Sequence, residues 1–228
     1  MRPLNTYFDH TLLKPDAVSR DIKLLCSQAM HYSFYSVCVN SCHVSEAYEY
    51  LRNSNVKITS VVGFPLGAME TSSKAYEADA ACRNGADEID MVINIGAMKE
   101  GNYKYVSDDI SNVASACYDN DAHLKVIIEA CLLTDEEIIK ACEIAEKAGA
   151  DFVKTSTGFS NTPDGSPGGA TVHAIKLMRA GISDSVKIKA SGGIHTLAQA
   201  NALIQAGADR LGCSASVDIM KEYLSYLT

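Results

Sequence analysis

The sequence lacks any apolar run long enough to cross a membrane. Its apolar strings are short, and residues 126–128, one such string, end at Glu129, whereas a spanning helix needs about 18 or more apolar residues. Residues 1–6 are not followed by an apolar stretch, so we expect no signal peptide. These absences predict a cytoplasmic protein with no membrane partner.

An excess of basic residues is also missing. The chain has 28 acidic and 20 basic side chains and a net charge of −8, which argues against a nucleic-acid partner or an anionic membrane surface. A content of 47% hydrophobic and 21% charged residues is typical of a soluble globular protein and excludes disorder. The 228 residues predict a single domain over residues 1–228, because one α/β barrel needs about 200–250 residues.

Motifs that hold metals or nucleotides are absent as well. The eight cysteines are scattered without a C-x-x-C pair, and we interpret them as reduced thiols of a cytosolic protein. Cys38, Cys42 and His43 come nearest to a metal cluster, but no second half-site accompanies them. There is no Walker lysine motif and no G-x-G-x-x-G. We therefore expect neither a metal nor another cofactor.

What the sequence does contain is a recurring Gly-Ala-Asp string. It occurs at residues 85–87, 149–151 and 207–209, each time between a helix-like and a strand-like segment. Glycine suits the left-handed position that ends many helices. The copies are separated by about two βα units of roughly 30 residues each, which indicates a regular alternation of strands and helices.

The intervening segments predict eight strands, near residues 7–11, 36–39, 58–63, 88–93, 124–129, 152–156, 186–190 and 210–213. Helical patterns between them include residues 17–30, 71–84, 103–120, 134–148, 171–179 and 196–206. Thr134 and Glu137 resemble a capping box. Eight alternating units predict the α/β class and a (β/α)8 TIM barrel. An open doubly wound sheet is the alternative, although such a sheet with six strands would leave two of the eight predicted strands outside it.

Three charged residues within these strands form the decisive pattern. They are Asp90, Lys154 and Lys189 on the fourth, sixth and seventh strands. No strand residue of a closed barrel reaches solvent sideways, so such charges lie in the pocket or extend to one end. Two neighbouring ammonium groups disfavour each other's charged form, which yields a neutral amine able to form a Schiff base, with the carboxylate moving protons. The pattern therefore indicates imine chemistry, and a structural ion-pair network is the alternative.

Other strand and loop residues suggest supporting roles. Asp9 and Lys125 are further strand-borne charges, for which the residues alone favour an inner ion pair over a proton relay. Glycines and hydroxyls follow the last two strands at residues 191–194 and 212–216, where barrels often bind phosphate, although ordinary turns also use such residues. The long loop at residues 160–169 is either a lid or a surface insertion.

At these residues the chain resembles the 2-deoxyribose-5-phosphate aldolases. The similarity covers nearly the full length and runs through residues 9–16, 37–40, 85–94, 124–129, 150–158 and 189–194. It implies a metal-free class I aldolase on a (β/α)8 barrel, without a cofactor. Such an enzyme reversibly splits 2-deoxy-D-ribose 5-phosphate into D-glyceraldehyde 3-phosphate and acetaldehyde. Another imine-forming phosphosugar aldolase or transaldolase is the alternative, and a phosphosugar-binding barrel without catalysis is a more distant one.

The resemblance also implies individual roles. Lys154 is the Schiff-base lysine, Asp90 the proton donor and acceptor, and Lys189 the neighbour that modulates the pKa of Lys154 and relays protons. Asp9 and Lys125 match positions that the family uses as a proton relay, so the resemblance implies a relay where the residues alone favoured a structural ion pair. The implied partner is a small phosphosugar, and family members are often dimers or tetramers. The substrate- and phosphate-binding set is Gly158, Gly192, Gly193, Gly212, Ser214, Ala215 and Cys38.

The chain departs from the family pattern in four places. Residues 160–169 form a longer loop than is usual after the Schiff-base strand. His195 stands where many relatives have an arginine, and Cys213 replaces a small or hydroxyl residue. The tail contains Tyr223 and Tyr226, and some relatives place a C-terminal tyrosine over the site.

Overall fold

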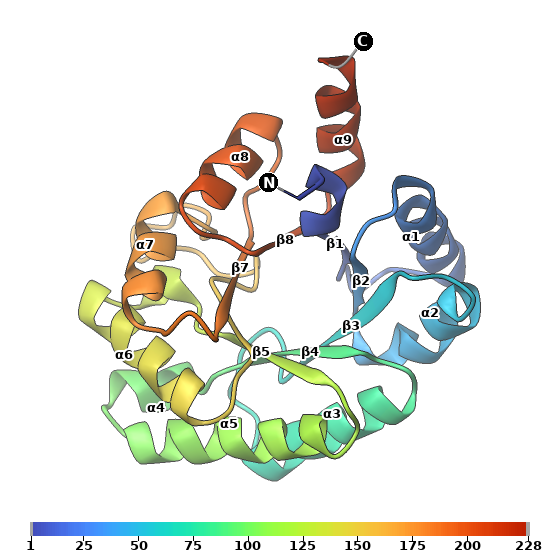
Figure 1. Cartoon of the computed structure of the whole chain (residues 1–228). Helices are drawn as coiled ribbons and strands as arrows, with labels where there is room; N and C mark the ends of the chain where they lie inside the picture. Colours follow the sequence, from blue (N-terminus) through green and yellow to red (C-terminus); the bar gives the residue numbers. More distant parts are fainter. Residues whose placement is uncertain (1, 227–228) are drawn as a thin grey trace.

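Eight parallel strands close into a barrel with helices around it (Figure 1). The computed structural model describes residues 2–226. Each strand pairs with its neighbour in chain order, and β8 pairs with β1 to close the ring. The TIM-barrel prediction is confirmed, and the open doubly wound sheet is wrong. Residues 1, 227 and 228 of the predicted domain lie outside the described residues.

The strands lie within two residues of their predicted positions. They are β1 (Phe8–Leu12), β2 (Ser36–Val39), β3 (Lys57–Val62), β4 (Glu88–Val92), β5 (His123–Ile127), β6 (Phe152–Lys154), β7 (Lys187–Ser191) and β8 (Arg210–Cys213). β6 ends earlier than predicted because, after Lys154, a side-chain hydroxyl takes the place of backbone hydrogen bonds between β6 and β7. The Thr155 hydroxyl accepts the Ser191 N–H at 3.0 Å and donates to the Ser191 carbonyl at 3.1 Å.

The helices cover the outside of the barrel (Figure 1). They are α1 (Ser19–Tyr32), α2 (Val44–Leu51), α3 (Thr71–Arg83), α4 (Ile95–Lys99), α5 (Tyr103–Tyr118), α6 (Asp135–Lys147), α7 (Val172–Ala180), α8 (Leu197–Gln205) and α9 (Ser216–Ser225), with 3-10 turns at Leu4–Tyr7, Ser41–His43 and Ala130–Leu132. The capping box at α6 is confirmed, because Thr134 and Glu137 bind each other's N–H groups. The short α2 and α4, and the α9 that follows the predicted phosphate turn, were not among the helices predicted.

Strand alternation separates an apolar outer core from a charged interior. Ile89 and Met91 on either side of Asp90 are fully buried among the apolar residues, because successive side chains of a strand point to opposite faces. The register then places inward residues of neighbouring strands side by side, as with Asp90 and Lys125 or Lys154 and Lys189. The strand pairing therefore gathers charges that the sequence spreads over six of the eight strands.

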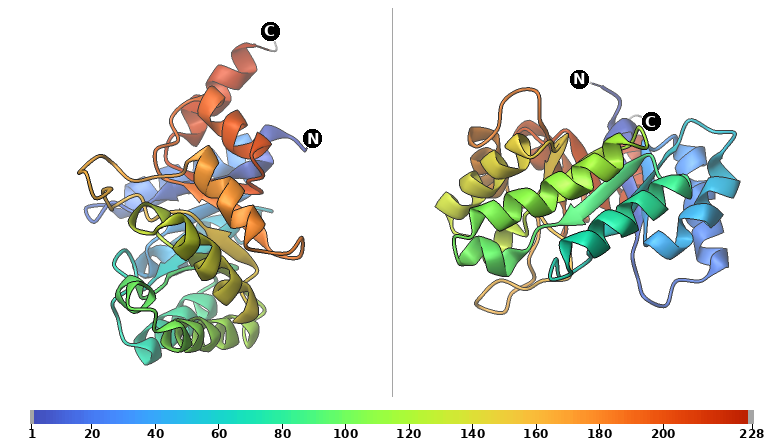
Figure 2. Two further views of the ribbon diagram at one scale, coloured as in Figure 1. Left: turned by 90° about the vertical axis from the view of Figure 1, so that its left-hand side faces the viewer. Right: turned by 90° about the horizontal axis from the view of Figure 1, so that it is seen from below.

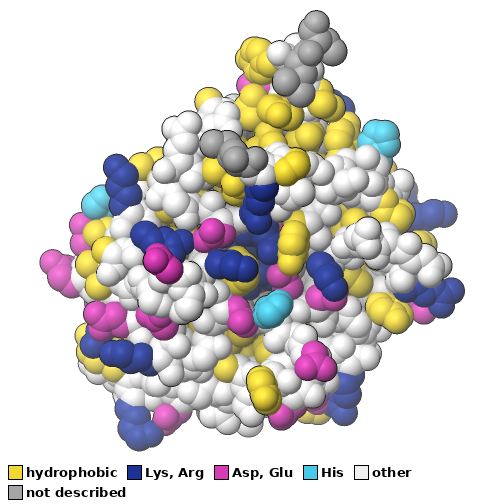
Figure 3. Space-filling model, viewed as in Figure 1, with side chains coloured by type: hydrophobic (Ala, Val, Ile, Leu, Met, Phe, Trp, Pro, Cys, Tyr) yellow, Lys and Arg dark blue, Asp and Glu magenta, His cyan; other side chains and the backbone are white. Residues whose placement is uncertain are grey.

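The two ends of the barrel differ. Figure 3 views the end at which the strands begin, where basic and acidic side chains mix around the barrel axis. Ion pairs such as Lys57–Asp87 and Arg179–Asp209 lie at this end. The loop between β6 and α7 projects from the opposite end (Figure 2). Among residues 2–226, no helix has the length and apolar character needed to cross a membrane.

Candidate active site

A cluster of seven charged side chains fills the inside of the barrel. Every member comes from a strand, and none is more than 3% exposed. Burying so many charges is costly unless they are paired with one another. The members are Asp9 on β1, Glu88 and Asp90 on β4, Lys125 on β5, Lys154 on β6, Lys189 on β7 and Arg210 on β8.

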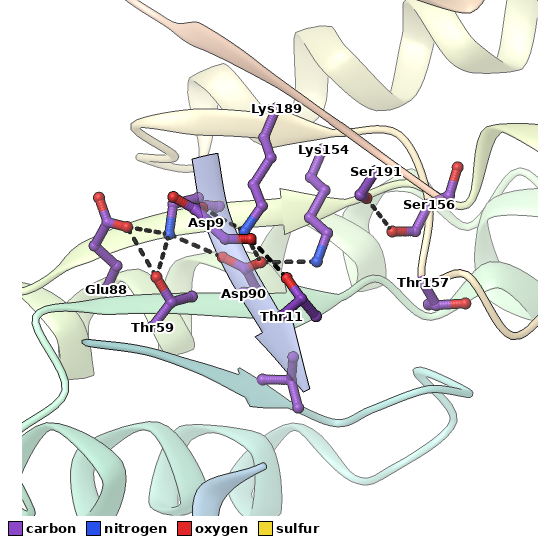
Figure 4. A network of polar contacts seen from close by, with 12 residues as sticks. Asp9, Thr11, Thr59, Glu88, Asp90, Lys154, Ser156, Thr157, Lys189 and Ser191 are labelled. Carbon is purple, nitrogen blue, oxygen red and sulfur yellow. Dashed lines mark hydrogen bonds and ion pairs between the residues drawn. The ribbon is translucent and has the colours of Figure 1, made fainter. Parts of the chain in front are cut away.

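Asp90 lies at the centre of this cluster (Figure 4). Its Oδ2 atom is 2.7 Å from the Nζ of Lys154 and 2.7 Å from the Nζ of Lys189. Its Oδ1 atom is 2.9 Å from the Nζ of Lys125. The structure thus brings together the aspartate and the two lysines that the strand pattern singled out, and it adds Lys125 to them.

Two residues that the sequence analysis did not select complete the cluster. Glu88 Oε2 accepts Lys125 at 2.7 Å, and Arg210 lies 2.8 Å from Asp9 Oδ1 and 3.4 Å from Glu88 Oε2. Asp9 Oδ2 is in turn 2.6 Å from Lys189 Nζ. Glu88 and Arg210 are charged residues within predicted strands, so the reasoning applied to Asp90 would have found them.

The charges of the cluster reinforce one another. Burial alone would raise the pKa of Asp90, but Lys125, Lys154 and Lys189 hold that pKa well below its usual range. Burial likewise opposes a charged Asp9, yet Arg210 and Lys189 lower the pKa of Asp9. Both aspartates are therefore carboxylates at neutral pH.

Lys189 is affected in the opposite direction. Burial would lower the pKa of Lys189, but the carboxylates of Asp9 and Asp90 outweigh this effect and raise it. Lys189 is therefore a stable cation. The strand pattern predicts two ammonium groups that face each other, whereas a carboxylate oxygen of Asp90 contacts both Lys154 and Lys189 in the structure.

A cavity of about 580 Å³ opens above the cluster at the end of the barrel where the strands finish. Lys154 lines it, and the six other charged residues of the cluster do not. Of the predicted phosphate-binding set, Ala215 and Cys38 are absent from its lining, since Ala215 packs against the core and Cys38 is buried within β2. The predicted residues that do line the cavity are Gly158, Gly192, Gly193, Gly212 and Ser214.

The glycines bring two backbone segments close together. Gly192 has a left-handed φ of 83°, and a Cβ atom at Gly169 would lie 2.6 Å from the Gly192 carbonyl oxygen. Ser214 lies two residues before the first residue of α9, and helix N-termini attract anions. Two basic side chains also line the cavity, His195 and the unpredicted Lys14. Lys14 is exposed and makes no side-chain ion pair with the described residues.

Glu129 holds the segment that follows Lys154 in place. It is 1% exposed and accepts hydrogen bonds from the Thr157 hydroxyl at 2.5 Å, the Thr157 N–H at 3.1 Å and the Ser160 hydroxyl at 3.0 Å. The Ser191 hydroxyl donates to the Ser156 carbonyl at 2.6 Å. Sequence reasoning did not select Glu129; its one signal was a charge at the end of a predicted strand.

The remaining candidates lie away from the cavity. Tyr223 is partly buried against the core, Tyr226 is 73% exposed, and neither lines the cavity. Cys42 is exposed whereas Cys38 is buried. In the part of the chain that the structure describes, no three His, Cys, Asp or Glu side chains are grouped in a way that could hold a metal ion.

Comparison with known proteins agrees with this arrangement. The sequence model of the DeoC/LacD family aldolases matches residues 4–221. The chain belongs to this aldolase family. The resemblance seen in the sequence is thereby confirmed, and as a DeoC/LacD aldolase the protein is a carbon–carbon lyase.

Relatives of this aldolase are similar over nearly their whole length. The deoxyribose-phosphate aldolases of Finegoldia magna and Aciduliprofundum boonei are 56% and 55% identical to it. Each alignment covers 96% of this chain, and 99% and 96% of the respective relative. A deoxyribose phosphate aldolase from Aeropyrum pernix, described as having a unique tetrameric structure, superposes with a TM-score of 0.89 at 29% identity. That superposition covers 98% of this chain and 92% of the other.

Proposed function

We propose that the protein reversibly cleaves 2-deoxy-D-ribose 5-phosphate to D-glyceraldehyde 3-phosphate and acetaldehyde through a Schiff base on Lys154. One observation carries the proposal: among the buried charged residues of the cluster, Lys154 alone lines the cavity. An amine at this position meets a carbonyl group that enters the cavity, while the other charges are held beneath it. The names and high identity of the relatives support the choice of substrate.

The proposed reaction begins when the neutral Lys154 amine attacks the aldehyde carbon of the open-chain sugar. Loss of water from the carbinolamine gives an iminium ion, which accepts the electrons of the breaking C2–C3 bond as the C3 hydroxyl loses its proton. D-Glyceraldehyde 3-phosphate leaves, and the enamine is protonated at C2. Hydrolysis then releases acetaldehyde and regenerates the amine. Asp90 transfers protons, since it contacts Lys154 directly.

The supporting roles follow from the same contacts. Lys189 joins Asp90 to Asp9, and this chain of short contacts is suited to relaying protons. Lys125 contacts the other oxygen of Asp90 and orients that carboxylate. Cys38 packs beside the cluster, and burial raises the pKa of its thiol, which keeps the thiol neutral.

The phosphate end of the substrate is placed at the glycine-rich side of the cavity. Backbone N–H groups next to the start of a helix bind phosphate oxygens, and a nearby cation adds to the attraction. Lys14 and His195 supply basic groups there. We propose that Ala215 contributes through its backbone at the N-terminus of α9. The set that surrounds the phosphate is Gly158, Gly192, Gly193, Gly212, Ser214 and Ala215.

A comparison of donor substrates tests this function. The purified protein is given D-glyceraldehyde 3-phosphate with either acetaldehyde or dihydroxyacetone, and the condensation products are quantified with and without a chelator. We expect product from acetaldehyde, little from dihydroxyacetone and no effect of the chelator. A preference for dihydroxyacetone would indicate a transaldolase-like enzyme. No product from either donor with a folded protein would indicate a phosphosugar-binding barrel.

We further propose that the enzyme is a cytoplasmic homo-oligomer, a dimer or tetramer, without nucleic-acid or membrane partners. The tetrameric description of the Aeropyrum pernix relative supports assembly, and eight free cysteines suit a reducing compartment. Light scattering of the purified protein tests assembly, because a monomeric mass at micromolar concentration would contradict it.

A further inference from the structure

The charges beneath the cavity form a closed ring in which positive and negative groups alternate. Each neighbour in the ring is in contact with the next, at distances from 2.6 to 3.4 Å. The three cations and three anions cancel, so the ring is neutral. Its order is Asp9, Lys189, Asp90, Lys125, Glu88 and Arg210, which returns to Asp9.

Lys154 is attached to this ring without being a member of it. Within residues 2–226 its one ion pair is with Asp90, whereas Lys125 and Lys189 each contact two carboxylates. A protonated Lys154 therefore gives the buried site a net charge of +1, and its deprotonation leaves the site neutral. Removing a proton from Lys125 or Lys189 would instead break the alternation and leave a buried carboxylate short of a partner.

We propose that Arg210 and Glu88 are positioning residues whose opposite charges balance within the ring, and that this balance makes Lys154 the lysine that becomes neutral. This inference rests on the proposed function, in which a neutral Lys154 attacks the substrate. Neither residue touches the cavity, so both act through the ring. Nearby carboxylates raise the pKa of Lys125 and of Lys189 against the effect of burial, as expected for ring members.

Arg210 is held firmly enough for this role. Its guanidinium carbon lies 3.3 Å from the centre of the Tyr35 ring and 5.4 Å from that of Phe152, and an aromatic ring face at such a distance attracts a cation. Its pKa is raised, because Asp9 and Glu88 outweigh the effect of burial. It therefore remains a fixed charge throughout the working pH range.

Groups on the other strands do not disturb this balance of charge. β3 contributes the neutral Thr59, whose hydroxyl lies 2.9 Å from Glu88 Oε2. β2 contributes Cys38, whose buried thiol is neutral because its pKa is raised. Lys187 at the start of β7 is exposed, and its ammonium group lies over the aromatic side chain of Phe152. It is not one of the six alternating charges.

Two substitutions that change the ring charge in opposite directions test the proposal. Glu88→Gln makes the surroundings of Lys154 more positive, so the acid limb of the kcat/KM–pH profile is expected to move to lower pH by about one unit. Arg210→Met makes the surroundings of Lys154 more negative, so the acid limb of the profile is expected to move to higher pH by about one unit. The double variant restores neutrality and is expected to match the wild type. Asp87→Asn, at an ion pair outside the ring, is the control and should leave the limb unchanged.

Trapping separates this inference from the proposed function. Each folded variant is also treated with acetaldehyde and borohydride, and an adduct on another lysine would contradict the proposed function itself. If the adduct lies on Lys154 but the acid limbs stay fixed or move in the same direction, the ring proposal is wrong. If a single variant does not fold, the acid limb of the double variant tests the proposal. A double variant that is unfolded, or whose acid limb differs from the wild type by more than about half a unit, contradicts the proposal.

Discussion

Asp90 divides the three lysines of the site between its two oxygens. Oδ1 contacts Lys125, while Oδ2 is shared by Lys154 and Lys189. In the proposed reaction, a proton released at Lys154 passes to an oxygen that already contacts a second ammonium group, and that ammonium group also contacts Asp9. The three lysines hold the pKa of Asp90 low, so the proposed function gives Asp90 the role of a carboxylate that exchanges protons with the Lys154 amine.

Removal of the Lys189 charge is expected to slow the reaction strongly. Lys189→Met leaves Asp9 and Asp90 with one cation fewer in a buried site, and kcat/KM at neutral pH should fall by about 10²–10⁴, as on loss of a general acid–base group. Lys187→Met is the matched control, because Lys187 lies on the same strand but is exposed. Steady-state kinetics with the two variants measure both effects. A Lys189→Met rate near that of the wild type would contradict its role.

At this scale the sequence was informative about charges within strands and silent about contacts between loops. Asp90, Lys154 and Lys189 could be predicted because a charged residue on a barrel strand either lies in the pocket or extends to one end of the barrel. Glu129 was not found, because its three hydrogen bonds to the segment after β6 depend on how two loops meet in space. Lys14 likewise reaches the cavity through the path of its loop.

Among the elements, the long loop between β6 and α7 contains a small hairpin. Asn161 and Pro167 form an antiparallel bridge, and Asp164 accepts hydrogen bonds from Thr162 and Ser166 within it. The hairpin is thus stabilised largely by its own contacts. Its base belongs to the cavity, because Pro167 lines the cavity.

Shortening this hairpin is expected to affect substrate binding more than folding. Replacing residues 162–166 by two glycines should leave the melting temperature nearly unchanged, since the lost hydrogen bonds are internal. The displaced base should raise KM for the phosphosugar about three- to tenfold, a loss of roughly 1 kcal/mol of binding. Thermal unfolding and steady-state kinetics measure the two effects. An unchanged KM would show that the loop is a plain surface insertion.

Strand positions were predictable because the Gly-Ala-Asp strings and the apolar segments mark where strands start. The end of β6 was not, because the hydroxyl of Thr155 takes over hydrogen bonds that a strand backbone would make. Such a replacement depends on Ser191 of the neighbouring strand, which is 36 residues away in the chain.

For the whole molecule, an acidic exterior surrounds an interior cluster with four cations and three anions. The net charge of −8 therefore describes the surface and not the site. Stability should depend on pH through groups that are buried in one protonation state, because their pKa values differ between the folded and unfolded chains.

His10 is such a group, and it is expected to limit stability at mildly acidic pH. It is 4% exposed and contacts Ser216 and Gln28, and burial lowers its pKa. Because the pKa of His10 is lowered, the residue contributes stability at pH values above its unfolded-state pKa of about 6.5. This stability is lost as the pH falls from that value toward the folded-state pKa. Urea unfolding from pH 8 to pH 5 should show this decline.

Two variants make the pH dependence specific. His10→Gln should flatten the decline, because the side chain no longer titrates. His31→Gln, at an exposed histidine, should retain it. If the His10→Gln variant declined as steeply as the wild type, His10 would not be the responsible group. The aspartates of the cluster do not contribute in this range, since their lowered pKa values matter only below about pH 4.

The measurement that tests the central claim most directly is the location of the trapped intermediate. The wild-type protein is treated with acetaldehyde and borohydride, digested and mapped by mass spectrometry. We predict one ethyl group on Lys154, because this amine alone among the buried lysines of the cluster reaches the cavity and lies outside the neutral ring. An ethyl group on Lys125 or Lys189 in its place, or no adduct at all, would contradict the assignment of Lys154.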